Sequence, residues 1–165
     1  MSGGSTRRII AALIVAAWAV PGVSTPAGAE STESCTAEAD FTITPGVGAN
    51  PSSGTFTTGG DTGTLTCKSG KGTMGFSGKY GTKDPDSCGS GGEGTATDTY
   101  KFADGSTLTD DVEFIYGAFQ NGLVGGSYKS ARASGQFEVT PLEGDCVSKP
   151  ITKAHATFKN IVVKR

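Results

Sequence analysis

The chain has 165 residues, with 14 Lys and Arg against 16 Asp and Glu, a formal net charge of −2, 26 glycines and four cysteines. This acidic balance excludes nucleic acid as a partner, because such binding depends on Lys and Arg that neutralise phosphates. It also argues against electrostatic docking on anionic lipid. A chain of this length fits one domain with one modest core.

The N-terminal segment has the organisation of an export signal. Arg7 and Arg8 precede an apolar run that is too short to span a bilayer, which needs about 20 apolar residues. The small residues of Ala27–Ala29 fit a signal-peptidase cleavage site. We therefore expect residues 1–29 to be a signal peptide and residues 30–165 to be a single secreted, extracellular domain.

Two export routes remain open at this point. The segment 6–10 contains adjacent arginines and suits either the general secretory route or a twin-arginine signal. A lipoprotein anchor does not fit, because the first cysteine, Cys35, lies beyond the expected cleavage site. We expect no membrane association once the signal is removed.

The cysteines predict disulfides. Cys35, Cys67, Cys88 and Cys146 form an even set in a chain that we expect to be exported, which is typical of two bridges. Their spacing does not match a zinc site, and the single histidine, His155, is distant from the nearest cysteine. We expect no metal and no cofactor.

The mature region is predicted to be all-β. Glycine, at about twice its average share of roughly 7%, interrupts every helical window. Apolar and polar residues alternate instead, as in 37–44, 137–140 and 153–159. We expect a single antiparallel up-and-down β-barrel of about eight strands, with a β-sandwich as the alternative. The expected strands are 36–44, 55–58 with 62–67, 72–79, 94–102, 107–116, 122–130, 134–140 and 151–162.

Charge favours closure of the barrel. The first strand region is acidic and the last is basic, so the two would pair as neighbours in a closed sheet. The residues are Glu33, Glu38 and Asp40 in the first region, and Lys153, Lys159, Lys164 and Arg165 in the last. A sandwich can also pair its terminal strands.

Strand order also predicts the disulfide pairing. In up-and-down order Cys35 and Cys67 lie at one end of the barrel, whereas Cys88 and Cys146 lie at the other. We expect bonds Cys35–Cys67 and Cys88–Cys146, although a single miscounted strand would reverse this assignment.

No catalytic set is evident. His155 alternates with Lys153 and Lys159, which places it on the wet face of its strand. Asp110, Asp111 and Glu113 form the densest acidic cluster. Asp110 and Asp111 point to opposite faces of their strand, and we expect a solvated surface rather than a glycosidase pair or a calcium site.

Two further loop and strand features have ordinary interpretations. Residues 84–86 are a weak calcium candidate, because they lack the ligand spacing of an EF-hand. Residues 89–94 do not open a helix and do not fit a phosphate loop. Gly125 and Gly126 predict a bulge or a kink, or else room for a ligand.

Aromatic side chains gather in the middle of the chain. We expect them to form a core, or alternatively the wall of an apolar cavity that suits a small hydrophobic ligand. The possible cavity residues are Phe76, Tyr100, Phe102, Phe114, Tyr116 and Tyr128. We expect this interior to lack proton-transferring groups.

Several short segments carry a resemblance to a known group. They are the Cys35 strand ending in Ile43-Thr44-Pro45-Gly46, Gly63-Thr64-Leu65-Thr66-Cys67, Ser87-Cys88 leading through Gly94-Thr95 to Ala103-Asp104-Gly105, and a late cysteine before the last strand. With them, most of 35–160 resembles a diffuse group of small exported actinobacterial Gly- and Thr-rich β-proteins of unknown function. The resemblance implies an exported β-fold with two disulfides, and it supplies no catalytic residue or ligand. A looser architectural likeness to allene-oxide-cyclase-like or lipocalin-like barrels is an analogy.

The sequence therefore predicts a secreted, non-catalytic β-barrel that binds a small apolar molecule or a protein partner at the cell surface. One alternative is a small cyclase- or isomerase-type enzyme using Glu113, a buried Tyr or His155, which requires an ionisable residue inside the cavity. Another is an interaction or inhibitor protein acting through the Gly-rich loops 45–54 and 81–92.

Overall fold

The computed structural model describes residues 30–59 and 63–165, so the expected signal peptide lies outside the described residues. Those described residues form strands and loops without a helix, and no candidate membrane-spanning helix occurs among them. The strands are β1 (Thr32–Val47), β2 (Gly54–Thr57), β3 (Gly63–Cys67), β4 (Gly70–Tyr80), β5 (Gly92–Lys101), β6 (Thr107–Tyr116), β7 (Val124–Lys129), β8 (Ala133–Glu143) and β9 (Ile151–Lys164).

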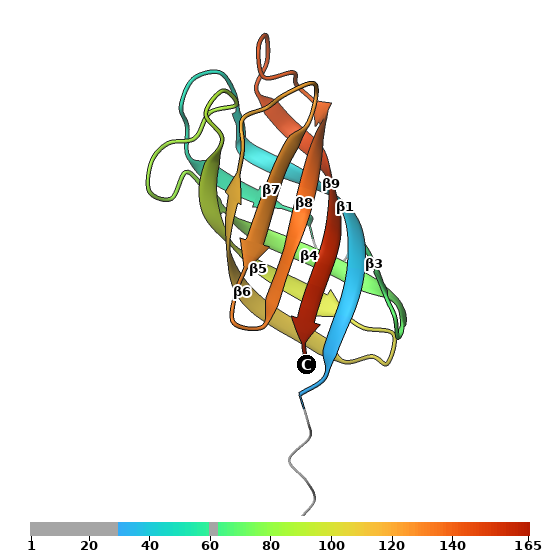
Figure 1. Ribbon diagram of the computed structural model, residues 1–165. Coiled ribbons are helices and arrows are strands. Elements are labelled where there is room, and N and C mark those ends of the chain that lie inside the picture. Colours follow the sequence, from blue (N-terminus) through green and yellow to red (C-terminus); the bar gives the residue numbers. More distant parts are fainter. Residues whose placement is uncertain (1–29, 60–62) are drawn as a thin grey trace, which may run out of the picture.

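The strands form one closed antiparallel barrel (Figure 1). Each strand pairs with the next along the chain from β3 to β9, and β9 pairs with β1 to close the ring. β2 and β3 share one position, because both pair with β1 on one side and β4 on the other. The prediction of an eight-stranded barrel is confirmed, and the expected single strand over 55–58 and 62–67 is divided into these two short strands.

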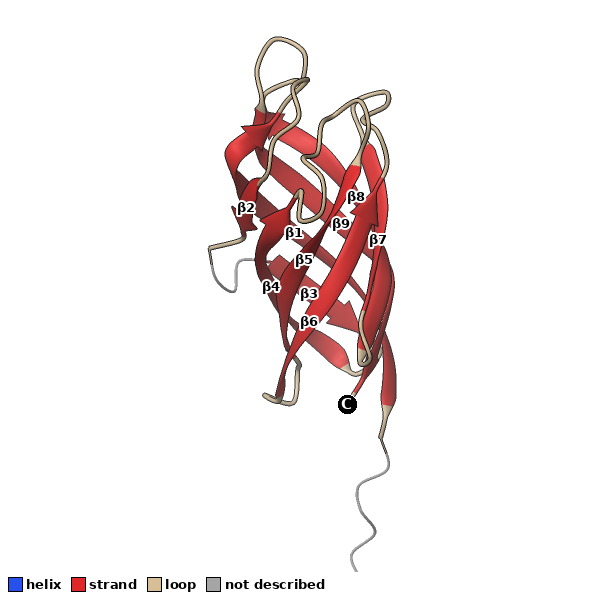
Figure 2. Cartoon of the chain, turned by 90° about the vertical axis from the view of Figure 1, so that its left-hand side faces the viewer, coloured by secondary structure: helices blue, strands red, loops and turns tan. Residues whose placement is uncertain are grey.

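The two ends of the barrel differ in the length of their connections (Figure 2). At the lower end, where the C-terminus lies in Figure 1, short turns join β3 to β4, β5 to β6 and β7 to β8. The upper end carries the longer loops 48–53, 81–91, 117–123 and 144–150. These loops join strands around one rim, and they therefore lie close together.

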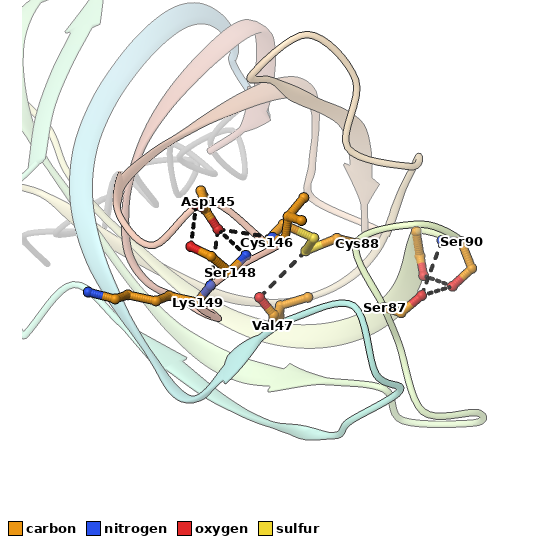
Figure 3. Close-up of a disulfide and its surroundings, with 10 residues drawn as sticks. Val47, Ser87, Cys88, Ser90, Asp145, Cys146, Ser148 and Lys149 are labelled. Atoms are coloured by element: carbon orange, nitrogen blue, oxygen red, sulfur yellow. Dashed lines mark hydrogen bonds between the residues drawn. A yellow bond between two sulfur atoms is a disulfide. The ribbon is translucent and has the colours of Figure 1, made fainter.

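The two disulfides follow this division, as the strand order predicted. Cys35–Cys67 links directly paired residues of β1 and β3 near the lower end. Cys88–Cys146 links two upper loops whose cysteines are 58 residues apart in sequence (Figure 3). Both are consistent with an oxidising environment.

Charged side chains of β1 and of the β9 region pair with one another, although not all of the expected pairs form. His155 Nδ1 lies 2.7 Å from Asp40 Oδ1, and Arg165 Nη1 donates to Glu33 Oε2 at 2.9 Å. Lys159 instead pairs with Glu138 of β8, at 2.6 Å. The first and last strands are therefore neighbours.

Many interior aromatic rings lie against a glycine on the neighbouring strand. A Cβ on Gly126 would lie 2.2 Å from Cζ of Phe137, its direct cross-strand partner. Glycine thus leaves the space that the opposite ring occupies. The pairs of this kind are Gly54–Tyr80, Gly78–Phe56, Gly94–Phe114, Gly126–Phe137 and Gly135–Tyr128.

This arrangement corrects the interpretation of Gly125 and Gly126. The register of β7 runs without a shift against both β6 and β8, so the predicted bulge is wrong. The space beside Gly126 is filled by the ring of Phe137, and is not available to a ligand. The register shifts lie instead in the pairings of β1 and β8 with β9.

Candidate functional site

The lower half of the barrel is filled. Its interior holds the largest fully buried side chains of the described residues, which are Leu65, Met74, Tyr100, Ile161 and Val163. Arg165 covers this end, with its guanidinium 4.0 Å from the centre of the Phe102 ring and hydrogen bonds to Glu33, Asp104 and Ser106.

The upper half encloses a cavity of about 140 Å³. Its wall is almost entirely apolar and rich in aromatic rings. An engineered protein cavity of about 150 Å³ with an apolar lining stays dry and binds benzene. The lining residues are Phe41, Ile43, Val47, Phe56, Phe76, Tyr80, Cys88, Ala96, Asp98, Val112, Phe114, Tyr116, Val124, Tyr128, Phe137, Val139, Ile151, Ala156 and Phe158.

The rings of the wall hold one another in place. Phe76 lies edge-on to Phe41 and to Phe158, with ring centroids 5.4 and 5.5 Å apart. Phe56 meets Phe114 in the same way at 5.4 Å. Edge-to-face pairs of this kind are favourable by about 0.5–1.5 kcal/mol each beyond the area they bury. The cavity is therefore bounded by mutually packed rings.

Asp98 is the single charged residue on this wall. It lies on β5, where Ala96, Asp98 and Tyr100 face inward by the two-residue alternation of the strand. The residue is 4% exposed, and its Oδ2 accepts a hydrogen bond of 2.9 Å from the Tyr100 hydroxyl. Ala96 lines the cavity whereas Tyr100 belongs to the filled core, so Asp98 stands at the floor.

Burial raises the pKa of Asp98 to about 7, with the negative charge of Asp110 adding to the rise and the Tyr100 hydrogen bond opposing it. Asp110 lies directly across the ladder on β6, and it accepts a hydrogen bond from the Ser130 hydroxyl. At neutral pH the Asp98 carboxyl is thus divided between its charged and neutral forms.

Two tyrosine hydroxyls lie beside the Asp98 carboxyl at the floor of the cavity. The hydroxyl oxygens of Tyr100 and Tyr128 lie 3.4 Å apart, and both side chains are buried. Burial raises the pKa of each phenol above its usual value, and in both cases the charge of Asp98 adds to the rise. These phenols therefore remain protonated at physiological pH and act as hydrogen-bond donors, not as bases.

Cys88 connects the loops above the cavity (Figure 3). Its backbone N–H donates to the Gly48 carbonyl at 3.0 Å, and its own carbonyl accepts from the Phe119 N–H at 2.7 Å. Its Sγ is bonded to Cys146 and lies 3.5 Å from the Val47 carbonyl oxygen. One residue thereby ties four chain segments together at the upper rim.

The loop after β8 is held by its own aspartate. Asp145 Oδ1 accepts hydrogen bonds from the backbone N–H groups of Val147, Ser148 and Lys149, at 3.0, 2.7 and 3.0 Å (Figure 3). The Ser148 hydroxyl bond and these backbone bonds lower the pKa of Asp145 to about 2. The loop is therefore ordered while Val147, at 88% exposed, projects into solvent.

The residues that the sequence indicated as possible cavity residues are divided between two places. Phe76, Phe114, Tyr116 and Tyr128 lie on the cavity wall. Tyr100 and Phe102 lie in the filled core below it. A role for any of them in ligand contact stays a prediction.

The titratable residues considered for catalysis lie outside the cavity. His155 pairs with Asp40 at the barrel surface, and Asp111 and Glu113 are exposed on the outer face of β6. Asp110 faces inward by its register opposite Asp98, although it does not line the cavity. The enzyme alternative required an ionisable residue inside the cavity, and neither Glu113 nor His155 lies there.

The weak calcium candidate in loop 81–91 has a structural role. Asp86 is buried, and its Oδ2 accepts hydrogen bonds from the Gly81 N–H at 2.7 Å and the Tyr116 hydroxyl at 2.8 Å. Among the described residues, one grouping has the compactness of a metal site, namely Glu33 with Cys35 and Cys67. Both of those sulfurs are in a disulfide, so they are not thiolate ligands.

Asp98 is the residue that the sequence analysis missed, and the prediction of an interior without proton-transferring groups is wrong. Asp98 belongs to no dense acidic cluster, because it is isolated between threonines. The sequence does indicate that Asp98 faces the interior, because it shares one face of an expected strand with Gly94, Ala96 and Tyr100. A single carboxylate in such an apolar row indicates a buried charge.

Comparison with protein-family models, with curated proteins and with solved structures gave no match for this chain. The resemblances drawn from the sequence therefore remain predictions.

Proposed function

We propose that this protein is a secreted binding protein that holds a small, mainly apolar molecule in the upper half of its barrel. The observation that carries the proposal is the cavity of about 140 Å³ with an aromatic wall, beside a lower half that is fully packed. An empty apolar space is unfavourable, since its wall lacks contacts that a filled core would have. A ligand of benzene size restores those contacts.

The upper rim suits the entry of an apolar molecule. Four large apolar side chains at or near this end are exposed, namely Ile115, Leu123, Leu142 and Val147, at 61, 37, 50 and 88%. Exposed apolar side chains at this end are compatible with the approach of an apolar molecule. The disulfides and the expected signal peptide support secretion, because both belong to an oxidising compartment.

A saturable thermal shift with toluene tests the proposal. Binding to the folded state alone raises its stability by about 2.7 kcal/mol when the free ligand is at 100 times its dissociation constant. We expect toluene to raise the melting temperature of the mature protein, and protein-observed NMR to place the shifted signals at the cavity wall. Absence of any saturable effect would contradict the proposal.

Two matched variants locate the site. Ala96→Leu adds volume on the inner face of β5, at a residue that lines the cavity. Thr95→Leu adds similar volume at the exposed neighbouring position. After both are shown to be folded by circular dichroism, the first is expected to abolish the toluene shift and the second to retain it.

A further inference from the structure

The carboxylate of Asp98 lies on the cavity wall without a cationic side chain beside it. Its Oδ2 accepts the Tyr100 hydroxyl at 2.9 Å, and a carboxylate has capacity for further hydrogen bonds. The residue is 4% exposed and lines the cavity. A buried carboxylate left with spare acceptor capacity is costly unless a donor or a cation meets it.

The wall itself offers no such cation, because no Lys, Arg or His is among the residues that line the cavity. The neighbouring charge is of the same sign, since Asp110 lies directly opposite Asp98 on β6. The remaining polar groups that face Asp98 are the hydroxyls of Tyr100 and Tyr128, and the Tyr100 hydroxyl already donates to Oδ2. A ligand that carries a hydrogen-bond donor can therefore use the remaining acceptor capacity of this carboxylate.

The rings around the floor favour a positively charged donor over a neutral one. The cavity wall includes Phe76, Tyr128 and Phe158, and the Tyr128 and Phe158 rings have centroids 5.9 Å apart. The faces of such rings attract cations, by about 2 kcal/mol or more where water is excluded. A protonated amine is attracted to both the carboxylate and the rings, whereas an alcohol gains only the hydrogen bond.

We propose that the cavity is selective for a small primary amine with one ring or a short apolar chain, whose ammonium group donates to the Asp98 carboxylate while the apolar part fills the aromatic cavity. This inference rests on the proposed function and names the ligand class of the same site. The size follows from the cavity volume of about 140 Å³, which is that of a single ring.

The protonation state of Asp98 makes the affinity for an amine depend on pH. The groups that face it are Tyr100, Tyr128 and Asp110, and of these the two phenols stay protonated because burial raises their pKa. The carboxyl of Asp98, whose pKa burial raises to about 7, has to lose its proton before it can pair with an ammonium. Amine affinity therefore rises by up to about tenfold per pH unit below pH 7 and levels off above it.

Calorimetric titration with three probes of similar shape tests the inference on the mature protein. The probes are benzylamine, benzyl alcohol and toluene, measured at pH 8 and at pH 5.5. We expect benzylamine to bind at least tenfold more tightly than the other two at pH 8, and to lose this advantage at pH 5.5. Asp98→Asn is expected to weaken benzylamine binding about 10- to 100-fold, in line with the loss of a hydrogen bond between charged groups, and to change toluene binding much less.

Asp111→Asn is the matched control, because Asp111 is an exposed carboxylate on the outer face of β6. It is expected to leave all three affinities unchanged. Equal binding of benzylamine and benzyl alcohol, or benzylamine binding that is insensitive to Asp98→Asn, overturns the inference while toluene binding still supports the proposed function. If none of the three probes binds, the proposed function fails as well.

Discussion

Below Asp98 the barrel interior is filled by side chains such as Leu65 and Ile161, which are fully buried, whereas above it the wall encloses a cavity of about 140 Å³. The strands are continuous from one half to the other, so the difference arises from side chains and loops. The lower rim has short turns and is covered by Arg165, and the upper rim has long loops tied together at Cys88. A packed core and a cavity thus lie at opposite ends of one barrel.

The first way to test this division is to remove each disulfide separately. Replacing Cys88 and Cys146 by alanine, or Cys35 and Cys67 by alanine, is expected to lower the free energy of unfolding by about 2–5 kcal/mol in either case. Only the upper pair joins loops that no strand ladder holds together. We therefore expect faster amide hydrogen exchange in loops 81–91 and 144–150 for the upper variant alone. The same loop exchange in the lower variant would contradict the division.

The boundary between the halves can be tested through Asp98. Its pKa in the folded state, about 7, lies above the ordinary value of 3.8 for an aspartate, so the folded chain holds the proton more tightly. Ionisation of Asp98 therefore destabilises the fold progressively from about pH 4 to about pH 7. We expect Asp98→Asn to raise the free energy of unfolding by about 2–3 kcal/mol at pH 8 and by almost nothing at pH 4.

Urea unfolding across this pH range measures the effect. Asp111→Asn, which changes an exposed carboxylate on the next strand, is the control and is expected to be neutral throughout. A stabilisation by Asp98→Asn that does not depend on pH would mean that Asp98 is not a buried, titrating group.

The smallest expected effect is the difference in the free energy of unfolding between the same substitution made in each half. Val163, in the filled half, is 0% exposed, and Val112, on the cavity wall, is 4% exposed. Val163→Ala is expected to cost about 2–3 kcal/mol, because it leaves a new void. Val112→Ala is expected to cost about half as much, because its side chain already lacks some neighbours. Chemical unfolding at one pH measures both, and equal losses would argue that the cavity wall is as tightly packed as the lower core.

The barrel itself could be predicted because each strand is indicated by a pattern within a short stretch of sequence. Alternation along 153–159 identified a strand with Ala154, Ala156 and Phe158 inward, and the structure buries those three side chains. Strand order then placed the cysteines at opposite ends, which fixed both disulfides. Each of these steps needed only the period of a strand and the direction of the chain.

Features that depend on contact between strands could not be predicted in the same way. The division of one strand into β2 and β3 depends on pairing with both β1 and β4. The fit of Gly126 against the Phe137 ring depends on cross-strand register, which the sequence alone left undetermined. Which rings line a cavity and which fill a core, as with Tyr116 and Tyr100, depends on the packing of the whole interior.

The pairing of glycines with rings has a consequence for how such a protein can change over generations. In pairs such as Gly94–Phe114 and Gly126–Phe137, the glycine has no side chain, and the ring from the adjacent strand occupies the space beside it. A Cβ on Gly94 or Gly126 would also lie 2.1 or 2.5 Å from a backbone carbonyl oxygen of a third strand, that of Lys79 or Ile115 respectively. Any larger residue at these glycines therefore requires the backbone to move, so the ring and the glycine of a pair cannot be exchanged freely, and substitutions at these glycines are expected to be strongly restricted.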